Sequence, residues 1–120
     1  MQKVMRKVML AEDDATMLHL LKTLLKMEGF QPIPLDTDAD IVSEVLSQQP
    51  DALLMDVHLA NKNGIDELKR LRGMEGGGQV RVVMASGLDV GETCLSQGAD
   101  AFLLKPFMPD DLIAALRGTN

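Results

Sequence analysis

Short runs of apolar residues alternate along this sequence with longer segments in which apolar residues recur every three or four positions. Four such runs cover residues 8–11, 52–55, 80–85 and 101–104. Short, almost uninterrupted apolar runs are typical of strands that are buried on both faces of a parallel sheet. The alternation therefore predicts a sheet that is covered by helices on both sides.

The longer segments each place their apolar side chains on one helical face. They cover residues 17–25, 41–46, 65–71, 90–97 and 112–116. Gly29 is predicted to end the first helix, Asp38 to cap the second, and Pro109 to begin the last. The three glycines at positions 76–78 predict a flexible connection.

A fifth extended segment covers residues 30–35 and contains Pro32 and Pro34. Because proline has no backbone N–H, this segment is predicted to be an edge strand or no strand at all. We expect one α/β domain over residues 1–120, built on a doubly wound, five-stranded parallel sheet. The expected strand order is 2-1-3-4-5, the flavodoxin-like order, with helices on both faces.

The composition excludes several classes of protein. The 120 residues carry a net charge of −6, so direct binding of this chain to nucleic acid is not expected. With no Trp, no Tyr and only 3 Phe, few rings are available to stack on bases or flavins. Cys94 is the single cysteine and no apolar run reaches the roughly 20 residues of a membrane span, so we expect a cytoplasmic protein without a membrane segment.

Polar residues that can do chemistry stand directly after the predicted strands. Glu12 and Asp13 follow the first strand, Asp56 the third, Ser86 the fourth and Lys105 the fifth. In a parallel sheet all these positions lie at the carboxyl edge, where such folds bind ligands. Because neighbouring strands are about 4.8 Å apart, Asp13 and Asp56 should reach a common ion.

Three carboxylates at one edge repel one another. Two like charges about 4 Å apart cost about 4 kcal/mol at an effective dielectric of about 20. A raised pKa on one carboxyl group would relieve this repulsion, and so would a divalent cation. An all-oxygen donor set suits Mg²⁺, which also takes phosphate oxygens as ligands. With Lys105 and Ser86 at the same edge, the set fits phosphoryl transfer to Asp56, which would form an acyl phosphate.

The same residues resemble the response-regulator receiver domain of two-component signalling. The resemblance rests on Glu12-Asp13, Asp56, Ser86-Gly87, Gly98-Ala99-Asp100 and Lys105-Pro106-Phe107, which occur in this order over essentially the whole chain. It implies a phosphoacceptor switch and not an enzyme that acts on an external substrate. A sensor histidine kinase or a phosphotransfer protein would pass a phosphoryl group from phosphohistidine to Asp56, and an output domain or target protein would receive the signal.

The resemblance also implies a metal site and a switch. Asp13 would bind Mg²⁺ directly and Glu12 through water, while Asp56 and the backbone carbonyl of His58 would be further ligands. Phosphoryl oxygens would be bound by Ser86 and Lys105. Phe102 stands where the family has its switching aromatic side chain, and the Lys105–Pro106 peptide is expected to be cis. Phosphorylation would change the face formed by residues 90–97, 101–104 and 112–116.

Three positions depart from the family pattern. Ala60 stands where the family usually has proline, and Asn63 where it often has aspartate. We expect a more mobile loop after the phosphoacceptor, without loss of function. Phe102 replaces the commoner tyrosine, which removes a hydroxyl group.

The same residues allow other interpretations. Each motif alone is also typical of a structural role, such as a polar turn at a strand end. A P-loop enzyme is excluded because no Gly-rich GK[ST] element follows the first strand, and a dehalogenase-type aspartyl phosphatase would need an acid where His58 stands. The main alternative is a receiver-like interaction module that works without phosphorylation.

Overall fold

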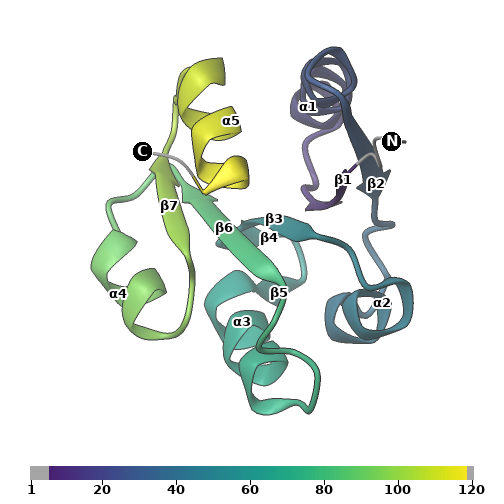
Figure 1. Cartoon of the computed structure of the whole chain (residues 1–120). Coiled ribbons are helices and arrows are strands. Elements are labelled where there is room, and N and C mark those ends of the chain that lie inside the picture. The colour runs from purple at the N-terminus through teal and green to yellow at the C-terminus, as the bar shows by residue number, and fades with distance from the viewer. Residues whose placement is uncertain (1–5, 119–120) are drawn as a thin grey trace.

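The computed structural model describes residues 6–118, and at their centre lies a five-stranded parallel sheet (Figure 1). Its strands are β1 (Arg6–Ala11), β2 (Phe30–Pro34), β3 (Ala52–Asp56), β6 (Arg81–Ser86) and β7 (Ala101–Leu104). The spatial order β2–β1–β3–β6–β7 confirms the predicted order 2-1-3-4-5. A short antiparallel hairpin, β4 (His58–Leu59) and β5 (Lys62–Asn63), follows β3, and the sequence pattern did not indicate it.

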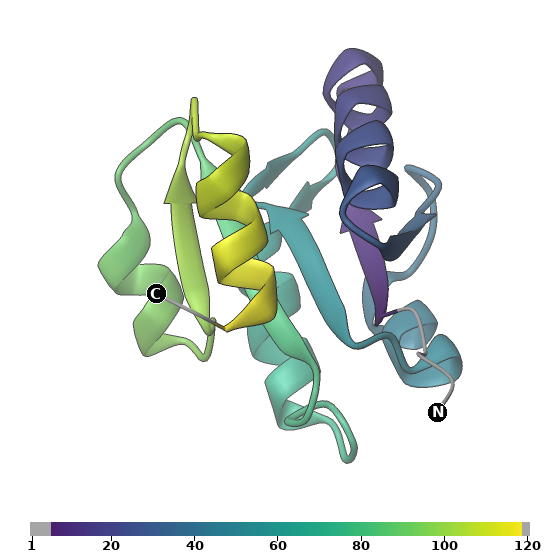
Figure 2. The same cartoon turned by 45° about the horizontal axis from the view of Figure 1, so that its top comes forward.

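Helices cover both faces of this sheet (Figures 1 and 2). They are α1 (Ala15–Met27), α2 (Ile41–Gln48), α3 (Gly64–Gly73), α4 (Gly91–Ser96) and α5 (Pro109–Arg117). The helices α2, α3 and α4 lie on one face, and α1 and α5 lie on the other. Along β1, Met9 belongs to the core under α2–α4, whereas Val8 and Leu10 belong to the core under α1 and α5. Both faces of the strands are therefore buried, which explains their continuous apolar runs.

The strand β2 lies at one edge of the sheet, as its two prolines predict. Leu35 N donates to Leu10 O (2.9 Å), so the N–H groups in the same phase of β2 point toward β1. Pro32 and Pro34 lie in the opposite phase, where the strand has no neighbour and needs no donor. The prolines therefore block the open edge against pairing with another strand.

The end of α1 and the start of α5 lie where the sequence predicts them. Gly29, just after α1, has a φ of 87°, and Pro109 is the first residue of α5. The predicted helix over residues 90–97 is present as the six residues of α4. No helix within residues 6–118 is both long enough and apolar enough to cross a membrane.

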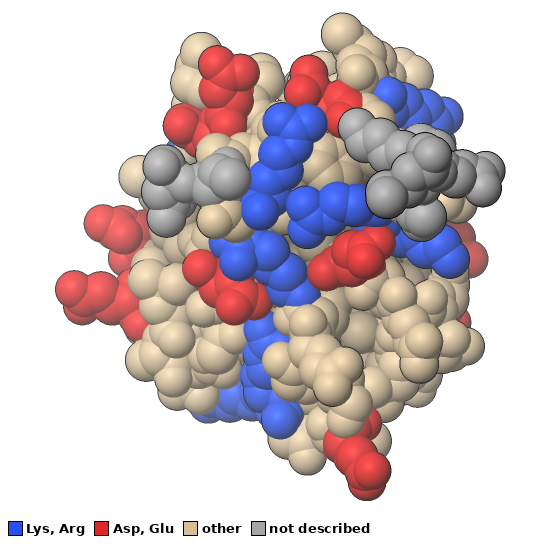
Figure 3. Space-filling view, in the orientation of Figure 1, with Lys and Arg blue, Asp and Glu red and all other residues tan. Residues whose placement is uncertain are grey.

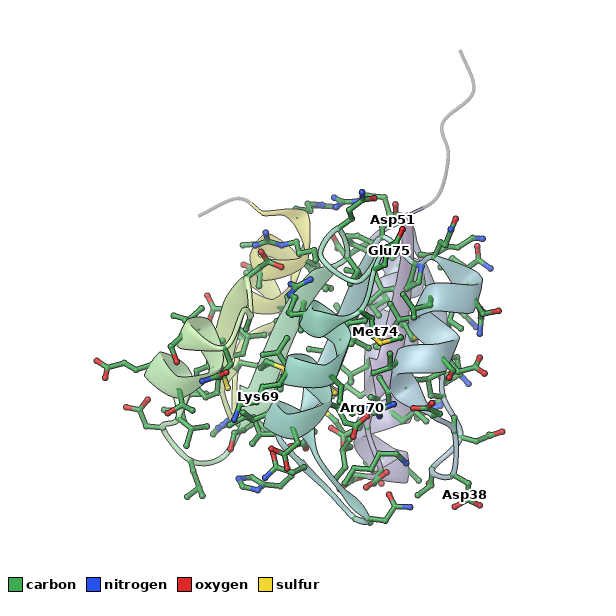
Figure 4. The ribbon with its side chains drawn as sticks, turned by 90° about the horizontal axis from the view of Figure 1, so that it is seen from below. Asp38, Asp51, Lys69, Arg70, Met74 and Glu75 are labelled. Atoms are coloured by element: carbon green, nitrogen blue, oxygen red, sulfur yellow. The ribbon has the colours of Figure 1, made fainter. Side chains whose placement is uncertain are left out.

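The prediction that Asp38 caps α2 is wrong. Residues 36–39 form a turn, in which Ala39 N donates to Asp36 O (3.0 Å), and the helix begins only after it. The N-cap residue is Asp40, whose carboxylate accepts a hydrogen bond from Ser43 Oγ (2.6 Å). Asp38 lies in the exposed turn before the helix (Figure 4).

Two arginines close the C-terminal end of α5. Arg81 Nε, from β6, donates to Ala115 O (2.6 Å), and Arg6, from β1, donates to Leu116 O (3.4 Å). These guanidinium groups pair carbonyl oxygens that have no partner within the helix, and their charge opposes the negative end of the helix dipole. Lys and Arg side chains form a band across the face shown in Figure 3, although the whole chain is acidic.

A third arginine, Arg72, holds the segment that was expected to be a flexible connection. Its guanidinium group donates to Gly77 O (2.9 Å), Val80 O (2.9 Å) and Gly98 O (2.9 Å), and it forms an ion pair with Asp100 (3.0 Å). The three glycines at positions 76–78 are therefore tied to α3, to the start of β6 and to the loop before β7. Because the Arg72 side chain is only 18% exposed, these bonds are largely shielded from water.

This network predicts that two arginines of α3 contribute very differently to the free energy of unfolding. Arg72→Ala should lower the free energy of unfolding by about 2–4 kcal/mol, because several carbonyl groups lose their partner together. Arg70→Ala is the matched control: its side chain is 55% exposed, and its pairs with Asp40 and Glu67 should contribute about 0–1 kcal/mol (Figure 4). Urea denaturation followed by circular dichroism measures both variants, and equal losses would contradict the structural role of Arg72.

Candidate functional site

The residues predicted to do chemistry lie together at the carboxyl edge of the sheet. Glu12 and Asp13 follow β1, Asp56 ends β3, Ser86 ends β6 and Lys105 follows β7. The register pairs Ala11 with Met55 and Asp56 with Ala85, so the ends of β1, β3 and β6 lie level. The parallel topology alone therefore brings these side chains to one edge.

Lys105 joins two of the three carboxylates. Its Nζ atom lies 2.6 Å from Asp56 Oδ2 and 3.1 Å from Glu12 Oε1. The side chains of Glu12 and Asp56 are only 9% and 12% exposed, so their charges are poorly screened by water. Lys105 therefore relieves the repulsion between these carboxylates with its own positive charge. A divalent cation or a raised carboxyl pKa was the relief expected from the sequence.

The surroundings of Lys105 also affect its own titration. Burial acts to lower the pKa of the ammonium group, but hydrogen bonds to Asp56 and Glu12 and the charges of both carboxylates outweigh it. The net result is a pKa above the ordinary value of 10.5. Lys105 is therefore positively charged throughout the neutral pH range.

The second carboxylate oxygen of Asp56 is bonded to the loop that follows it. Asp56 Oδ1 accepts a hydrogen bond from His58 N (2.9 Å), and the His58 side chain is exposed. The sequence analysis gave no role to Gly64, the first residue of α3, yet a Cβ atom there would lie 2.5 Å from Asp56 O. Gly64 N also donates to Val57 O (2.7 Å). Only glycine allows α3 to begin this close to the backbone of Asp56. A glycine directly after a turn is the sequence feature that could have indicated this close approach.

Asp13 is not joined to the other two acids. Its Oδ2 atom accepts a hydrogen bond from the backbone N–H of Ala60, at the turn of the β4–β5 hairpin. Within residues 6–118, no group of three or more His, Cys, Asp or Glu side chains is arranged to hold a metal ion. That Asp13 and Asp56 share an ion stays a prediction.

The donor atoms at this edge fit Mg²⁺ in their chemistry. Carboxylate oxygens of Asp13 and Asp56 and the backbone carbonyl of His58 would hold the ion, with Glu12 assisting through water. Mg²⁺ prefers such oxygen ligands and keeps several water molecules, so a few protein ligands are sufficient. The nearby ammonium group of Lys105 does not compete as a ligand, because it has no lone pair when charged.

Ser86 and Phe102 lie on the β6 and β7 side of the site. Ser86 is completely buried, and its Oγ atom accepts a hydrogen bond from Leu88 N (3.0 Å). Phe102 is partly buried and lies against α4, where a Cβ atom on Gly91 would approach the ring to 2.9 Å. Both residues are therefore near the segment that links β6 to α4.

Two further expectations concern the loops around the site. The Lys105–Pro106 peptide is cis, as expected. Asn63 accepts hydrogen bonds from Ile65 N (2.9 Å) and Asp66 N (3.2 Å) and so caps α3. Asparagine and aspartate are about equally good N-cap residues, so this departure from the usual family residue preserves the start of the helix.

Comparison with known proteins agrees with this geometry. The response regulator receiver domain family matches residues 8–117. Transcriptional regulatory protein CpxR of Escherichia coli K12 is 40% identical over 116 residues, which are 94% of this chain and 48% of CpxR. DNA-binding response regulator MtrA of Mycobacterium bovis is 31% identical over 121 residues, 98% of this chain and 51% of MtrA. The chain thus spans about half the length of the curated relatives it matches.

A solved structure shows the same fold. The receiver domain of sensor histidine kinase PA1611 from Pseudomonas aeruginosa has a TM-score of 0.83 and 25% sequence identity, with 96% of this chain and 97% of that one covered. A magnesium ion is coordinated in the active site cleft of that protein. On the fold, the matched residues and the relatives together, this chain belongs to the response regulator receiver domain family.

Proposed function

We propose that this chain is a phosphoacceptor switch of a two-component system, in which Asp56 receives a phosphoryl group from the phosphohistidine of a partner. The observation that carries the proposal is the contact of Lys105 with both Asp56 and Glu12. It joins the expected nucleophile, an expected metal ligand and the expected phosphate-binding cation in one group. Receiver domains have a phosphoacceptor role in two-component signalling, and the family match supports that role here.

The transfer step follows from the chemistry of the carboxylate. One oxygen of Asp56 would form a bond to phosphorus while the bond between phosphorus and the histidine nitrogen breaks, and the imidazole would keep that electron pair. The product would be an acyl phosphate on Asp56. Lys105 would hold a phosphoryl oxygen, and Asp13, Glu12 and the His58 carbonyl would hold Mg²⁺. When bound, Mg²⁺ would neutralise negative charge on the phosphoryl oxygens.

The response would follow from a change of partner at Ser86. Its hydroxyl group now pairs with Leu88 N, and it would turn to bind a phosphoryl oxygen on Asp56. Phe102 would then move relative to α4, which would change the face formed by α4, β7 and α5. Shifting a switch from rare to dominant takes about 5.5 kcal/mol of differential stabilisation, so several such contacts must act together.

The proposal extends to the organisation of the protein. We take residues 1–120 as one receiver domain that catalyses only its own phosphorylation and dephosphorylation. The partners would be a sensor histidine kinase or a phosphotransfer protein, and an output domain or target protein. CpxR and MtrA are named as transcriptional and DNA-binding regulators and are about twice as long, which supports an output outside these residues. We expect this domain to make no direct contact with nucleic acid or membrane and to act in the cytoplasm.

The first prediction from the proposed function concerns the phosphoryl acceptor. Asp56→Asn should abolish phosphorylation by acetyl phosphate with Mg²⁺, because an amide oxygen cannot form the acyl phosphate. Asp51→Asn is the matched control, since Asp51 lies just before the other end of β3 (Figure 4), and it should be phosphorylated normally. Intact-protein mass spectrometry measures the product. If the unaltered chain gains no phosphoryl group, an interaction module that works without phosphorylation replaces this proposal.

The second prediction separates binding of the phosphoryl analogue from the conformational response of the domain. Ser86→Ala should still bind beryllofluoride with Mg²⁺, but the backbone amide shifts of α4 and β7 in NMR spectra should change much less than in the unaltered chain. The reason is the loss of the hydroxyl group that would contact the phosphoryl oxygen. Ser43→Ala, at an exposed position of α2, should respond fully. A complete response of the Ser86 variant would exclude this serine from the switch.

The third prediction concerns the charge of Lys105. Lys105→Met should lower the free energy of unfolding at pH 7 by about 1–3 kcal/mol, because two largely buried carboxylates lose their counter-charge. The raised pKa means that the stabilisation by Lys105 is complete below pH 10.5 and is lost as the pH rises further. Urea denaturation at pH 7 and above pH 10.5 should show the difference from the unaltered chain shrinking. Lys69→Met, at an exposed site on α3, should have little effect at either pH (Figure 4).

A further inference from the structure

We infer that Ala60 is a positioning residue whose backbone N–H holds Asp13 away from Asp56 and thereby weakens the binding of Mg²⁺. The inference rests on the proposed function, because it concerns the regulation of the same site.

The contact itself is between a charged acceptor and a fixed donor. Asp13 Oδ2 accepts a hydrogen bond from Ala60 N. A hydrogen bond to a carboxylate is roughly twice as strong as one between neutral groups. Asp13 is exposed, so its carboxylate has little other packing to hold it, and this bond decides its orientation.

The loop that carries the donor is anchored independently of Asp13. The hairpin pairs His58 with Asn63 and Leu59 with Lys62. Lys62 Nζ also donates to Thr37 O (3.0 Å), which ties the hairpin to the loop after β2. The position of the Ala60 N–H is therefore defined by contacts other than its bond to Asp13.

The arrangement of the three acids shows how this bond affects the metal site. Glu12 and Asp56 are joined through Lys105, while Asp13 is bonded to the hairpin, and the described residues contain no set of three acids arranged around one point. Mg²⁺ demands nearly ideal octahedral geometry, so it does not accept a ligand held in the wrong direction. Binding of Asp13 together with Asp56 to one Mg²⁺ would therefore compete with the Ala60 N–H for the Asp13 carboxylate.

The identity of residue 60 makes this competition possible. Alanine carries the N–H that donates to Asp13, whereas proline at this position would have no backbone N–H and could not make the bond. We therefore expect lower Mg²⁺ affinity in this chain than in a variant with proline at position 60.

The test compares Mg²⁺ binding by three forms of the full chain. Ala60→Pro removes the donor, and its dissociation constant for Mg²⁺, measured by isothermal titration calorimetry, should be about tenfold lower than that of the unaltered chain. Ala60→Gly keeps the N–H and loses only the side chain, so its dissociation constant should be unchanged within about twofold. Equal affinity of all three forms, or weaker binding by Ala60→Pro, would overturn the inference.

A measurement on the unaltered chain covers the case in which Ala60→Pro does not fold. Titration with Mg²⁺ should move the Ala60 amide proton upfield in NMR spectra and speed its exchange with solvent, because the bond to Asp13 is lost. The Leu88 amide, bonded to Ser86, should not lose protection. Retained protection of the Ala60 amide at saturating Mg²⁺ would contradict the inference while leaving the proposed function intact. If no form binds Mg²⁺, the metal site of the proposed function fails and this inference fails with it.

Discussion

Electrostatic compensation at the carboxyl edge is the constraint on which the site depends. Glu12 and Asp56 are largely buried, and each would be costly there without an opposite charge. Lys105 supplies that charge at 2.6 Å from one carboxylate and 3.1 Å from the other. The charged ammonium group of Lys105 therefore offsets the negative charge of the expected nucleophile and of an expected metal ligand.

The topology makes this compensation possible. β1 and β3 are neighbours, so their C-terminal ends bring two acids together, whereas β7 lies two strands away from β3. Two strand spacings are about 9.6 Å, a gap that the long side chain of lysine helps to span across the end of β6. Ser86 ends β6, the strand between β3 and β7, and its backbone oxygen accepts a hydrogen bond from Lys105 N (2.8 Å). The order of the strands and the length of one side chain therefore define the site together.

The sequence was sufficient for the features that depend on periodicity and on strand ends. It predicted the sheet order, the edge position of β2 and the edge at which Asp56, Ser86 and Lys105 meet. It failed where a contact between distant segments decides the structure. The bond from Ala60 to Asp13 crosses 47 positions, and the contacts of Arg72 fix a glycine-rich connection that composition alone describes as flexible. The residue type alone predicts Asp38 as the cap of α2, but the turn at 36–39 delays the start of the helix, so that Asp40 is the N-cap residue.

The contacts at the two edges of the sheet differ in a way that suits a switch. At the amino edge, Arg6 and Arg81 bond to backbone carbonyls of α5 and close the end of that helix. At the carboxyl edge, His58 N and Lys105 Nζ donate to Asp56, and a phosphoryl oxygen could replace the carboxylate as their acceptor. The Ser86 hydroxyl accepts from Leu88 N and could donate its own proton to such an oxygen. Phosphorylation would therefore exchange existing partners and would not fill empty positions. An exchange of partners keeps the free-energy difference between the two states small, so that one added group can decide which state predominates.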